Sequence, residues 1–275
     1  MKASFGATAE NQDSTIEALH TALDNGVTFF DTADIYAPTW NTFGHNELLV
    51  AEAMRSHPLG SKAIIATKGG ITRKPGEVWA RNSSLDYLLR AAEASAGRLG
   101  VEKIALWQHH RLDPNMTFES QLENLAGLKQ RGLIEHIGVS NYSAKQLRRA
   151  VEVIGPIATV QNQLSPAYRQ ELDVLAVCEE FDITYLPWSP MQGAHAWDAL
   201  PELVAFAALH GASTYAVTVA WLQSLSPKVV PLPGVTRKES VLDALFGLGV
   251  ELKGEFPLAP TLPMDEELLS DQPKL

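Results

Sequence analysis

The chain of 275 residues is 45% hydrophobic and 20% charged, which is typical of a globular protein with a sizeable core and argues against a disordered chain. Its net charge of −10 argues against a nucleic-acid partner, because contacts to phosphates need a basic face. The single cysteine, Cys178, excludes an internal disulfide and a thiolate metal cage. With no apolar run of membrane length and no signal-peptide core in residues 1–11, we expect a cytoplasmic protein with no membrane partner.

Hydrophobic periodicity predicts helices that alternate with strands along the chain. The expected strands are short apolar runs at residues 27–30, 63–67, 104–108, 136–139, 157–161, 183–188 and 229–232. The expected helices lie at residues 14–24, 46–55, 85–98, 119–129, 144–154, 172–181, 203–210 and 216–225. Residues 69–82 are read as a loop. This alternation predicts a parallel sheet with helical crossovers.

The number and spacing of these elements favour one particular α/β architecture. We expect a (β/α)₈ TIM barrel that occupies residues 1–275 as a single domain, with its first strand poorly represented or absent. A doubly wound open sheet is the alternative, but it would favour a glycine-rich phosphate turn after its first strand. Gly247 and Gly249 begin such a pattern, yet Leu252 stands in the place of its third glycine.

Four polar residues fall at or just past the ends of the first three predicted strands, namely Asp31, Tyr36, Lys68 and His110. A carboxylate, a phenol, an amine and an imidazole at one rim of a barrel could transfer a proton. Taken singly, each residue has an ordinary structural explanation, and we expect the neighbouring His109 to face the other way and serve the structure. No second histidine or carboxylate lies at the spacing that metal ligands have on a helix, so no metal site is predicted.

Residues 138–142 raise the alternative of a serine hydrolase. Residues 138–142 read GVSNY, which is similar to a nucleophile elbow until Tyr142 replaces its final glycine. A serine hydrolase is therefore not favoured.

The four polar residues lie in segments that together resemble the aldo-keto reductases. These segments are FDTADIY at residues 30–36, ATK at 66–68, QHHRLDP at 108–114 and GVSN at 138–141. The resemblance implies a catalytic tetrad of Asp31, Tyr36, Lys68 and His110. It also implies an oxidoreductase that reduces aldehydes or ketones with a nicotinamide cofactor, acting on a small-molecule carbonyl substrate.

The residue types agree with that chemistry. Hydride addition to a carbonyl builds negative charge on its oxygen, so a proton donor must lie close to that oxygen. Tyr36 is the expected donor, although a phenol has an ordinary pKa of about 10. A nearby ammonium lowers that pKa by stabilising phenolate, which is the role expected for Lys68, with Asp31 holding the amine in place. His110 is expected to orient or polarise the carbonyl oxygen.

The resemblance also assigns residues to the cofactor. It places Ser140, Asn141 and Gln161 against the nicotinamide carboxamide and Trp188 against the nicotinamide ring. The loops expected to hold the cofactor phosphates supply Ser189, Met191, Gly234, Thr236 and Arg237. An arginine in such a loop suits a 2′-phosphate, so NADPH is the expected cofactor.

The chain also departs from the family pattern. We expect it to lack the N-terminal hairpin and most or all of the first barrel strand, and the loop at residues 192–200 looks short for one that would fold across the pyrophosphate. Candidate walls of an apolar substrate pocket are Trp40, Trp79 and Trp107, although each could equally pack within the barrel. An alternative function is a nicotinamide-binding regulatory or interaction subunit with little turnover, and an oligomer is possible.

Overall fold

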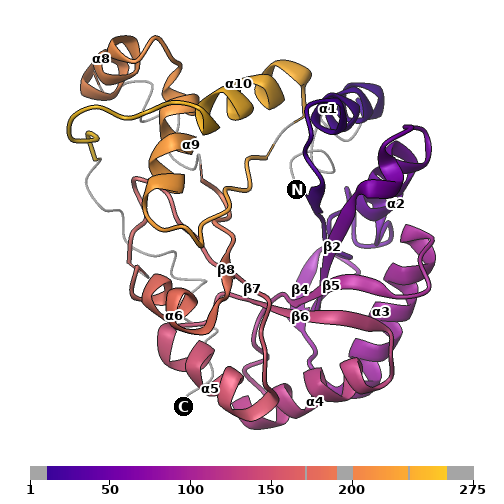
Figure 1. Ribbon diagram of the computed structural model, residues 1–275. Helices are drawn as coiled ribbons and strands as arrows, with labels where there is room; N and C mark the ends of the chain where they lie inside the picture. The colour runs from indigo at the N-terminus through magenta and orange to yellow at the C-terminus, as the bar shows by residue number, and fades with distance from the viewer. Residues whose placement is uncertain (1–10, 171, 191–200, 235, 259–275) are drawn as a thin grey trace.

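The computed structural model describes residues 11–170, 172–190, 201–234 and 236–258, in which six parallel strands form one curled sheet (Figure 1). The strands follow one another across the sheet in chain order, without the reversal of order that marks a doubly wound fold. They are β1 (Phe29–Asp31), β2 (Ile64–Gly69), β5 (Ile104–His109), β6 (Ile134–Ser140), β7 (Thr159–Gln161) and β8 (Thr184–Tyr185). The sheet is that of a partial β/α barrel, which confirms the fold class expected from the sequence.

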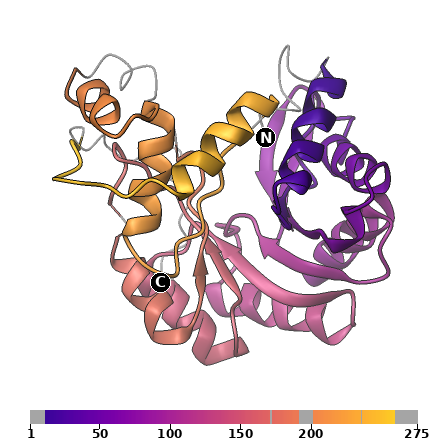
Figure 2. The same cartoon turned by 45° about the horizontal axis from the view of Figure 1, so that its top comes forward.

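Helices surround the outer face of this sheet (Figures 1 and 2). They are α1 (Gln12–Asp24), α2 (His45–Arg55), the short 3₁₀ turn η3 (Gly60–Lys62), α3 (Leu85–Leu99), α4 (Phe118–Gln130), α5 (Ala144–Ile154), α6 (Asp173–Phe181), α8 (Pro201–Leu209), α9 (Thr214–Ser224) and α10 (Lys238–Leu248). Helix α5 starts at a capping box, in which Ser143 and Gln146 exchange side-chain and backbone hydrogen bonds. Side-chain caps also begin α1, α4 and α9.

The barrel is open along one side, between β1 and the segment at residues 229–232. The strand expected at that segment is reduced to one bridge between Tyr185 and Val229, supported by hydrogen bonds from Tyr185 N to Lys228 O and from Val230 N to Tyr185 O. Among the described residues, β1 pairs only with β2. Within residues 11–258, apart from the positions not described, the sheet is therefore open between β1 and Val229.

Helices of the outer layer contact one another across the gap in the sheet. Helix α10 packs on α1, and Val241 lies in a small core with Ala18, Ala22 and Phe30. Helix α10 was not expected from the sequence, because two glycines near its end obscured the spacing of Val241, Ala244 and Gly247 on its buried face. The helices thus bridge a gap that no strand fills in the described part of the chain.

A second correction concerns residues 69–82, which were read as a loop. They form an antiparallel hairpin of β3 (Ile71–Lys74) and β4 (Val78–Arg81), separate from the main sheet. Gly76 and Glu77 at its tip both have positive φ, of 80° and 60°. These strands were missed because each has only four residues and neither has a clear apolar alternation.

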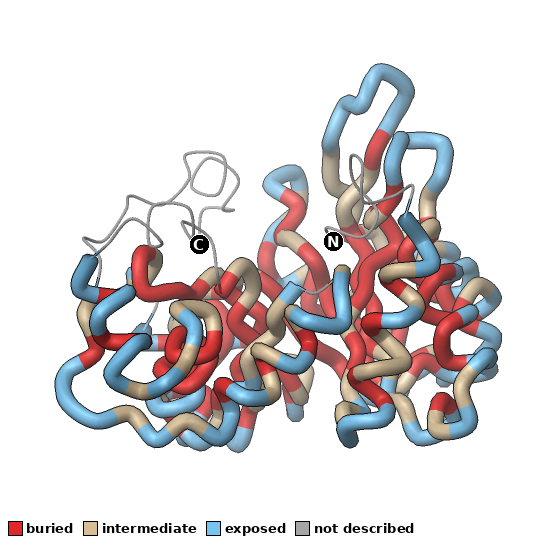
Figure 3. The backbone as a smooth tube through the Cα atoms, turned by 90° about the horizontal axis from the view of Figure 1, so that it is seen from above, coloured by how far each residue is buried: buried red, intermediate tan, exposed pale blue. Residues whose placement is uncertain are grey.

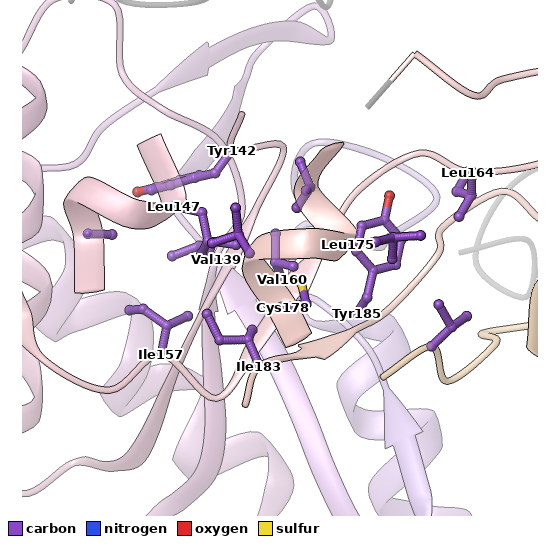
Figure 4. Close-up of a cluster of buried hydrophobic side chains, with 14 of the residues drawn as sticks. Val139, Tyr142, Leu147, Ile157, Val160, Leu164, Leu175, Cys178, Ile183 and Tyr185 are labelled. Carbon is purple, nitrogen blue, oxygen red and sulfur yellow. The ribbon is translucent and has the colours of Figure 1, made fainter. Parts of the chain in front are cut away.

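The main hydrophobic core lies between the sheet and the helices, as the buried central segments in Figure 3 indicate. Figure 4 shows one part of it, where Val139 and Val160 meet residues of α5 and α6 together with Cys178. Burial raises the pKa of the Cys178 thiol to about 12, which agrees with a structural role. Trp107 is also fully buried in this core, so its predicted place in a substrate pocket is wrong.

No single helix in the described ranges is long and apolar enough to cross a membrane. Helices α8 and α9 are long and apolar enough only when taken together, and the break between them bends the pair by 82°.

Candidate active site

The four residues of the expected tetrad meet at the carboxyl ends of three neighbouring strands. Asp31 ends β1, Lys68 lies one residue before the end of β2, and His110 directly follows β5. Tyr36 lies in the segment after β1, whose backbone continues beside β2 through hydrogen bonds from Thr32 N to Ala66 O and from Asp34 N to Lys68 O. Parallel strands place their carboxyl ends together, which is why residues far apart in sequence converge here.

Lys68 is the centre of this cluster and is fully buried. Its Nζ donates to Asp31 Oδ2 at 2.5 Å and to the carbonyl of Thr32 at 2.8 Å. The same ammonium lies 5.1 Å from the centroid of the Tyr36 ring. A buried lysine therefore binds the carboxylate of Asp31 and places its charge beside the phenol of Tyr36.

Two glutamines hold the other oxygen of the carboxylate. Gln108 Nε2 and Gln161 Nε2 donate to Asp31 Oδ1 at 2.8 Å and 3.1 Å, and Thr159 Oγ1 donates to Gln108 Oε1 at 3.3 Å. Gly138 leaves the space that this network needs, because a Cβ there would lie 2.3 Å from Thr159 Oγ1 and 2.7 Å from Gln108 Cγ.

Gln108 was missed by reasoning from sequence. The signal that could have identified it is register, since Gln108 is paired with Lys68 across the parallel strands β2 and β5. Residues paired in this way point to the same face of a sheet.

The electrostatics of the cluster set the protonation of the phenol and the amine. Burial raises the pKa of Tyr36, while the charge of Lys68 opposes that rise, and the net pKa lies above the ordinary value. Burial lowers the pKa of Lys68, but attraction to Asp31 and Tyr36 outweighs it and leaves the pKa raised. The charge of Lys68 lowers the pKa of Tyr36 as expected, but burial raises it more, so the expected net lowering is not found. Tyr36 is a protonated phenol beside a charged amine at neutral pH.

His110 faces Tyr36, and their ring centroids are 5.7 Å apart in an edge-on arrangement. Burial and the nearby charge of Lys68 lower the pKa of His110 well below its ordinary value, so the ring is neutral at neutral pH. Its Nδ1 is buried without a hydrogen-bond partner in the described structure. A neutral imidazole beside a phenol can donate a hydrogen bond to an oxygen placed between them.

His109 points away from this cluster, as expected from strand alternation. Its Nε2 lies 2.8 Å from Ser83 Oγ and its Nδ1 lies 2.8 Å from Tyr142 Oη. Burial lowers its pKa to about 4. These contacts give His109 a structural role.

The residues expected at the nicotinamide carboxamide lie together at the ends of β6 and β7. Ser140 Oγ donates to the carbonyl of Gln161 at 2.7 Å, and Asn141 Nδ2 donates to Ser140 Oγ at 2.8 Å. Trp188 Nε1 donates to Asn141 Oδ1 at 3.0 Å, which fixes the half-buried indole beside them. The side-chain amide of Gln161 is directed to Asp31, so this residue links the two groups of the site.

The residues expected at the cofactor phosphates are more dispersed. Ser189 follows Trp188 with a φ of 49°, and Gly234 is exposed on the segment leading to α10. The carbonyl of Thr236 accepts a hydrogen bond from Ser14 Oγ at 2.9 Å. The exposed Arg237 directly precedes the first residue of α10. Met191 lies outside the described residues, as does the loop at 192–200.

Comparison with known proteins shows which family this chain resembles. The model of the aldo/keto reductase family matches residues 2–256. A probable aldo-keto reductase of Glycine max is 30% identical to this chain over 273 residues, covering 88% of this chain and 77% of the relative.

Two solved structures extend the comparison. A thermostable aldo-keto reductase in complex with the inhibitor epalrestat has a TM-score of 0.74 and 27% identity, over 88% of this chain and 84% of that one. The aldo-keto reductase from Klebsiella pneumoniae in complex with NADPH has the same fold, with a TM-score of 0.74, 24% identity and coverage of 90% and 83%.

Proposed function

This chain belongs to the aldo/keto reductase family of nicotinamide-dependent oxidoreductases, and we propose that it reduces aldehydes or ketones to alcohols with NADPH and with Tyr36 as the general acid. The proposal rests above all on one feature, the buried ammonium of Lys68, which is bound to Asp31 and lies beside the phenol of Tyr36. A fixed positive charge next to a phenol supports proton donation, because it stabilises the phenolate that remains.

Each residue of the tetrad takes a distinct part in that transfer. Tyr36 keeps its proton at neutral pH and donates it to the substrate oxygen as negative charge develops there. Lys68 stabilises the phenolate that is left, and Asp31 holds Lys68 in place. The neutral ring of His110 donates a hydrogen bond to the same substrate oxygen and thereby orients the carbonyl.

The chain offers suitable groups for the cofactor. When bound, reduced nicotinamide supplies hydride to the carbonyl carbon. Ser140, Asn141 and Gln161 present hydroxyl and amide groups suited to a carboxamide, and Trp188 presents an indole suited to an aromatic ring. Arg237 carries a positive charge at the start of α10, and this location suits a phosphate and supports NADPH.

The substrate is proposed to be a carbonyl compound with an apolar or aromatic body. Trp40 and Trp79 are 38% and 51% exposed, in contrast to the buried Trp107. Both belong to segments joined to the Tyr36 loop, since Glu77 binds the backbone N–H of Trp40 and Arg73 lies against Trp79. Large exposed rings on segments that adjoin the Tyr36 loop favour flat, apolar molecules.

A direct assay tests the proposal. Purified protein is expected to oxidise NADPH, followed at 340 nm, when a reactive aromatic aldehyde such as 4-nitrobenzaldehyde is added. Tyr36→Phe is expected to abolish this turnover while NADPH still quenches tryptophan fluorescence with an unchanged Kd. Equal turnover by the variant contradicts the role of Tyr36. Tight NADPH binding with no turnover by the unaltered protein would favour the alternative of a regulatory or interaction subunit.

A further inference from the structure

We propose that Arg73, on the hairpin β3–β4, is the positioning residue that holds Tyr36 in place for proton transfer. This inference rests on the proposed role of Tyr36 as the acid. The hairpin lies outside the main sheet, and among the described residues its strands pair only with each other. Its contacts with the Tyr36 segment give it a function that neither the sequence motifs nor the barrel requires.

The guanidinium of Arg73 holds the backbone on both sides of Tyr36. Its Nη1 donates to the carbonyl of Ile35 at 3.3 Å and to the carbonyl of Ala37 at 2.8 Å. The carbonyl of Tyr36 itself accepts from the backbone N–H of Asn46 at 3.0 Å. Three consecutive carbonyls around the proposed acid are therefore bound, two of them by one side chain.

These contacts are buried, which makes them costly to lose. Arg73 is only 8% exposed, and both Ile35 and Ala37 are buried. A buried carbonyl that loses its donor is destabilising, so the segment would rearrange if the guanidinium were removed. Rearrangement would move Tyr36 relative to Lys68 and His110.

Glu77 locks Arg73 in this position. Its Oε2 accepts from Arg73 Nε at 3.0 Å and from Arg73 Nη2, and its Oε1 accepts from the backbone N–H of Trp40 at 2.9 Å. The ring of Trp79 lies 4.8 Å from the Arg73 guanidinium carbon. Arginine suits this place because its planar fork reaches two carbonyls and a carboxylate at once, which the single ammonium of a lysine cannot do.

The hairpin turn bears a conformational cost that agrees with this role. Glu77 adopts a φ of 60°, a left-handed conformation that disfavours residues with a side chain. In this conformation its carboxylate binds both Arg73 and the loop at Trp40. Strained residues of this kind tend to occur where a geometry is needed for function.

Steady-state kinetics of Arg73→Lys and Arg73→Met test the inference. We expect kcat with an aromatic aldehyde to fall about tenfold to a hundredfold, because small displacements of catalytic groups have effects of this size. The Kd of NADPH is expected to stay unchanged. The kinetic isotope effect on kcat with NADPH deuterated at the transferred position is expected to rise, because the chemical step becomes slower. Glu77→Gln, which keeps an acceptor for Trp40, is expected to lose less activity.

Arg148→Lys is the matched control. Arg148 pairs with Glu180 and lies 5.7 Å from the ring of Phe181, so it repeats the carboxylate and aromatic contacts of Arg73 between α5 and α6. It is expected to leave kcat and the isotope effect unchanged. NADPH titration also gives the fraction of each Arg73 variant that can bind the cofactor. If kcat falls only as far as that fraction falls, Arg73 has a merely structural role and the inference is overturned. Unchanged kcat in folded Arg73→Met would also overturn it.

Amide hydrogen exchange separates this inference from the proposed function. Arg73→Met is expected to speed exchange in residues 35–44, and Arg148→Lys is not. If Tyr36→Phe turns over like the unaltered protein, the proposed acid is wrong whatever Arg73 does. If the unaltered protein shows no turnover, exchange alone decides whether Arg73 orders the Tyr36 loop, and unchanged exchange refutes it.

Discussion

The two sides of this barrel are built differently. On one side, β2, β5 and β6 pair continuously, and a buried polar network runs from Thr159 through Gln108 and Asp31 to Lys68. On the other side, between β1 and Val229, no strands pair within the described residues, and helices α1 and α10 form the contact. The comparison suggests that the proposed proton-transfer chemistry needs the continuous sheet, whereas the cofactor phosphates can be held by the open side.

Removal of the buried amine should have the largest effect. Lys68→Met is expected to lower kcat by about 10²–10⁴-fold, because the phenolate of Tyr36 and the carboxylate of Asp31 both lose their counter-charge. Stopped-flow measurement of NADPH oxidation checks this. NADPH titration by fluorescence is the control, because it shows whether the variant still binds the cofactor. If Lys68→Met keeps its activity, the buried network of the continuous sheet is not needed for proton transfer.

Acid stability should depend strongly on the continuous side. The pKa of His109 falls from 6.5 to about 4 on folding, mainly through burial, so the unfolded chain binds a proton there that the native chain does not. Stability is therefore lost as the pH falls from about 6.5 to about 4, by about 3 kcal/mol.

Urea unfolding of the unaltered protein and of His109→Gln at several pH values measures this term. The variant is expected to be less stable at neutral pH but to show a flatter dependence in the acid range. Asp34 acts in the opposite direction, since burial raises its pKa and its contribution is lost as the pH rises. Asp34 is present in both proteins, so its contribution cancels when their unfolding free energies are subtracted at each pH. If the two plots of unfolding free energy against pH run parallel, the role given to His109 is refuted.

Packing at Gly138 should have a moderate effect. Gly138→Ala is expected to cost about 1–3 kcal/mol of unfolding free energy, because its Cβ would overlap Thr159 and Gln108. It should also reduce turnover by moving Gln108 away from Asp31. The control is Gly97→Ala within α3, where a Cβ meets nothing within 4 Å and a stabilisation of about 0.5–1 kcal/mol is expected. Equal unfolding midpoints for the two variants would contradict this account.

The open side should respond least to substitution. Ser14→Ala removes the hydrogen bond to the carbonyl of Thr236 and is expected to cost about 0.5–1.5 kcal/mol, with kcat unchanged. Thermal unfolding and the Kd of NADPH measure the effect. A large loss of kcat would show that the gap between β1 and Val229 is part of the catalytic structure after all.

The sequence predicted the α-helices other than α10 and the six strands of the main sheet, and it predicted the grouping of the tetrad through the alternation of strands and helices. It did not predict α10, whose glycines obscure its buried face, or the hairpin that carries Arg73. The one-domain organisation and the cytoplasmic location stay predictions. So does NADPH as the specific cofactor.

The sequence by itself determined which chemical groups end each strand, because strand and helix periodicity are local properties of the chain. Only the tertiary structure decided which polar atoms bind one another. Gln108 holds Asp31 through sheet register, Trp107 is buried rather than exposed, and Arg73 reaches carbonyls more than thirty residues away in sequence. Burial and register depend on what packs from distant parts of the chain, and local patterns do not contain that information.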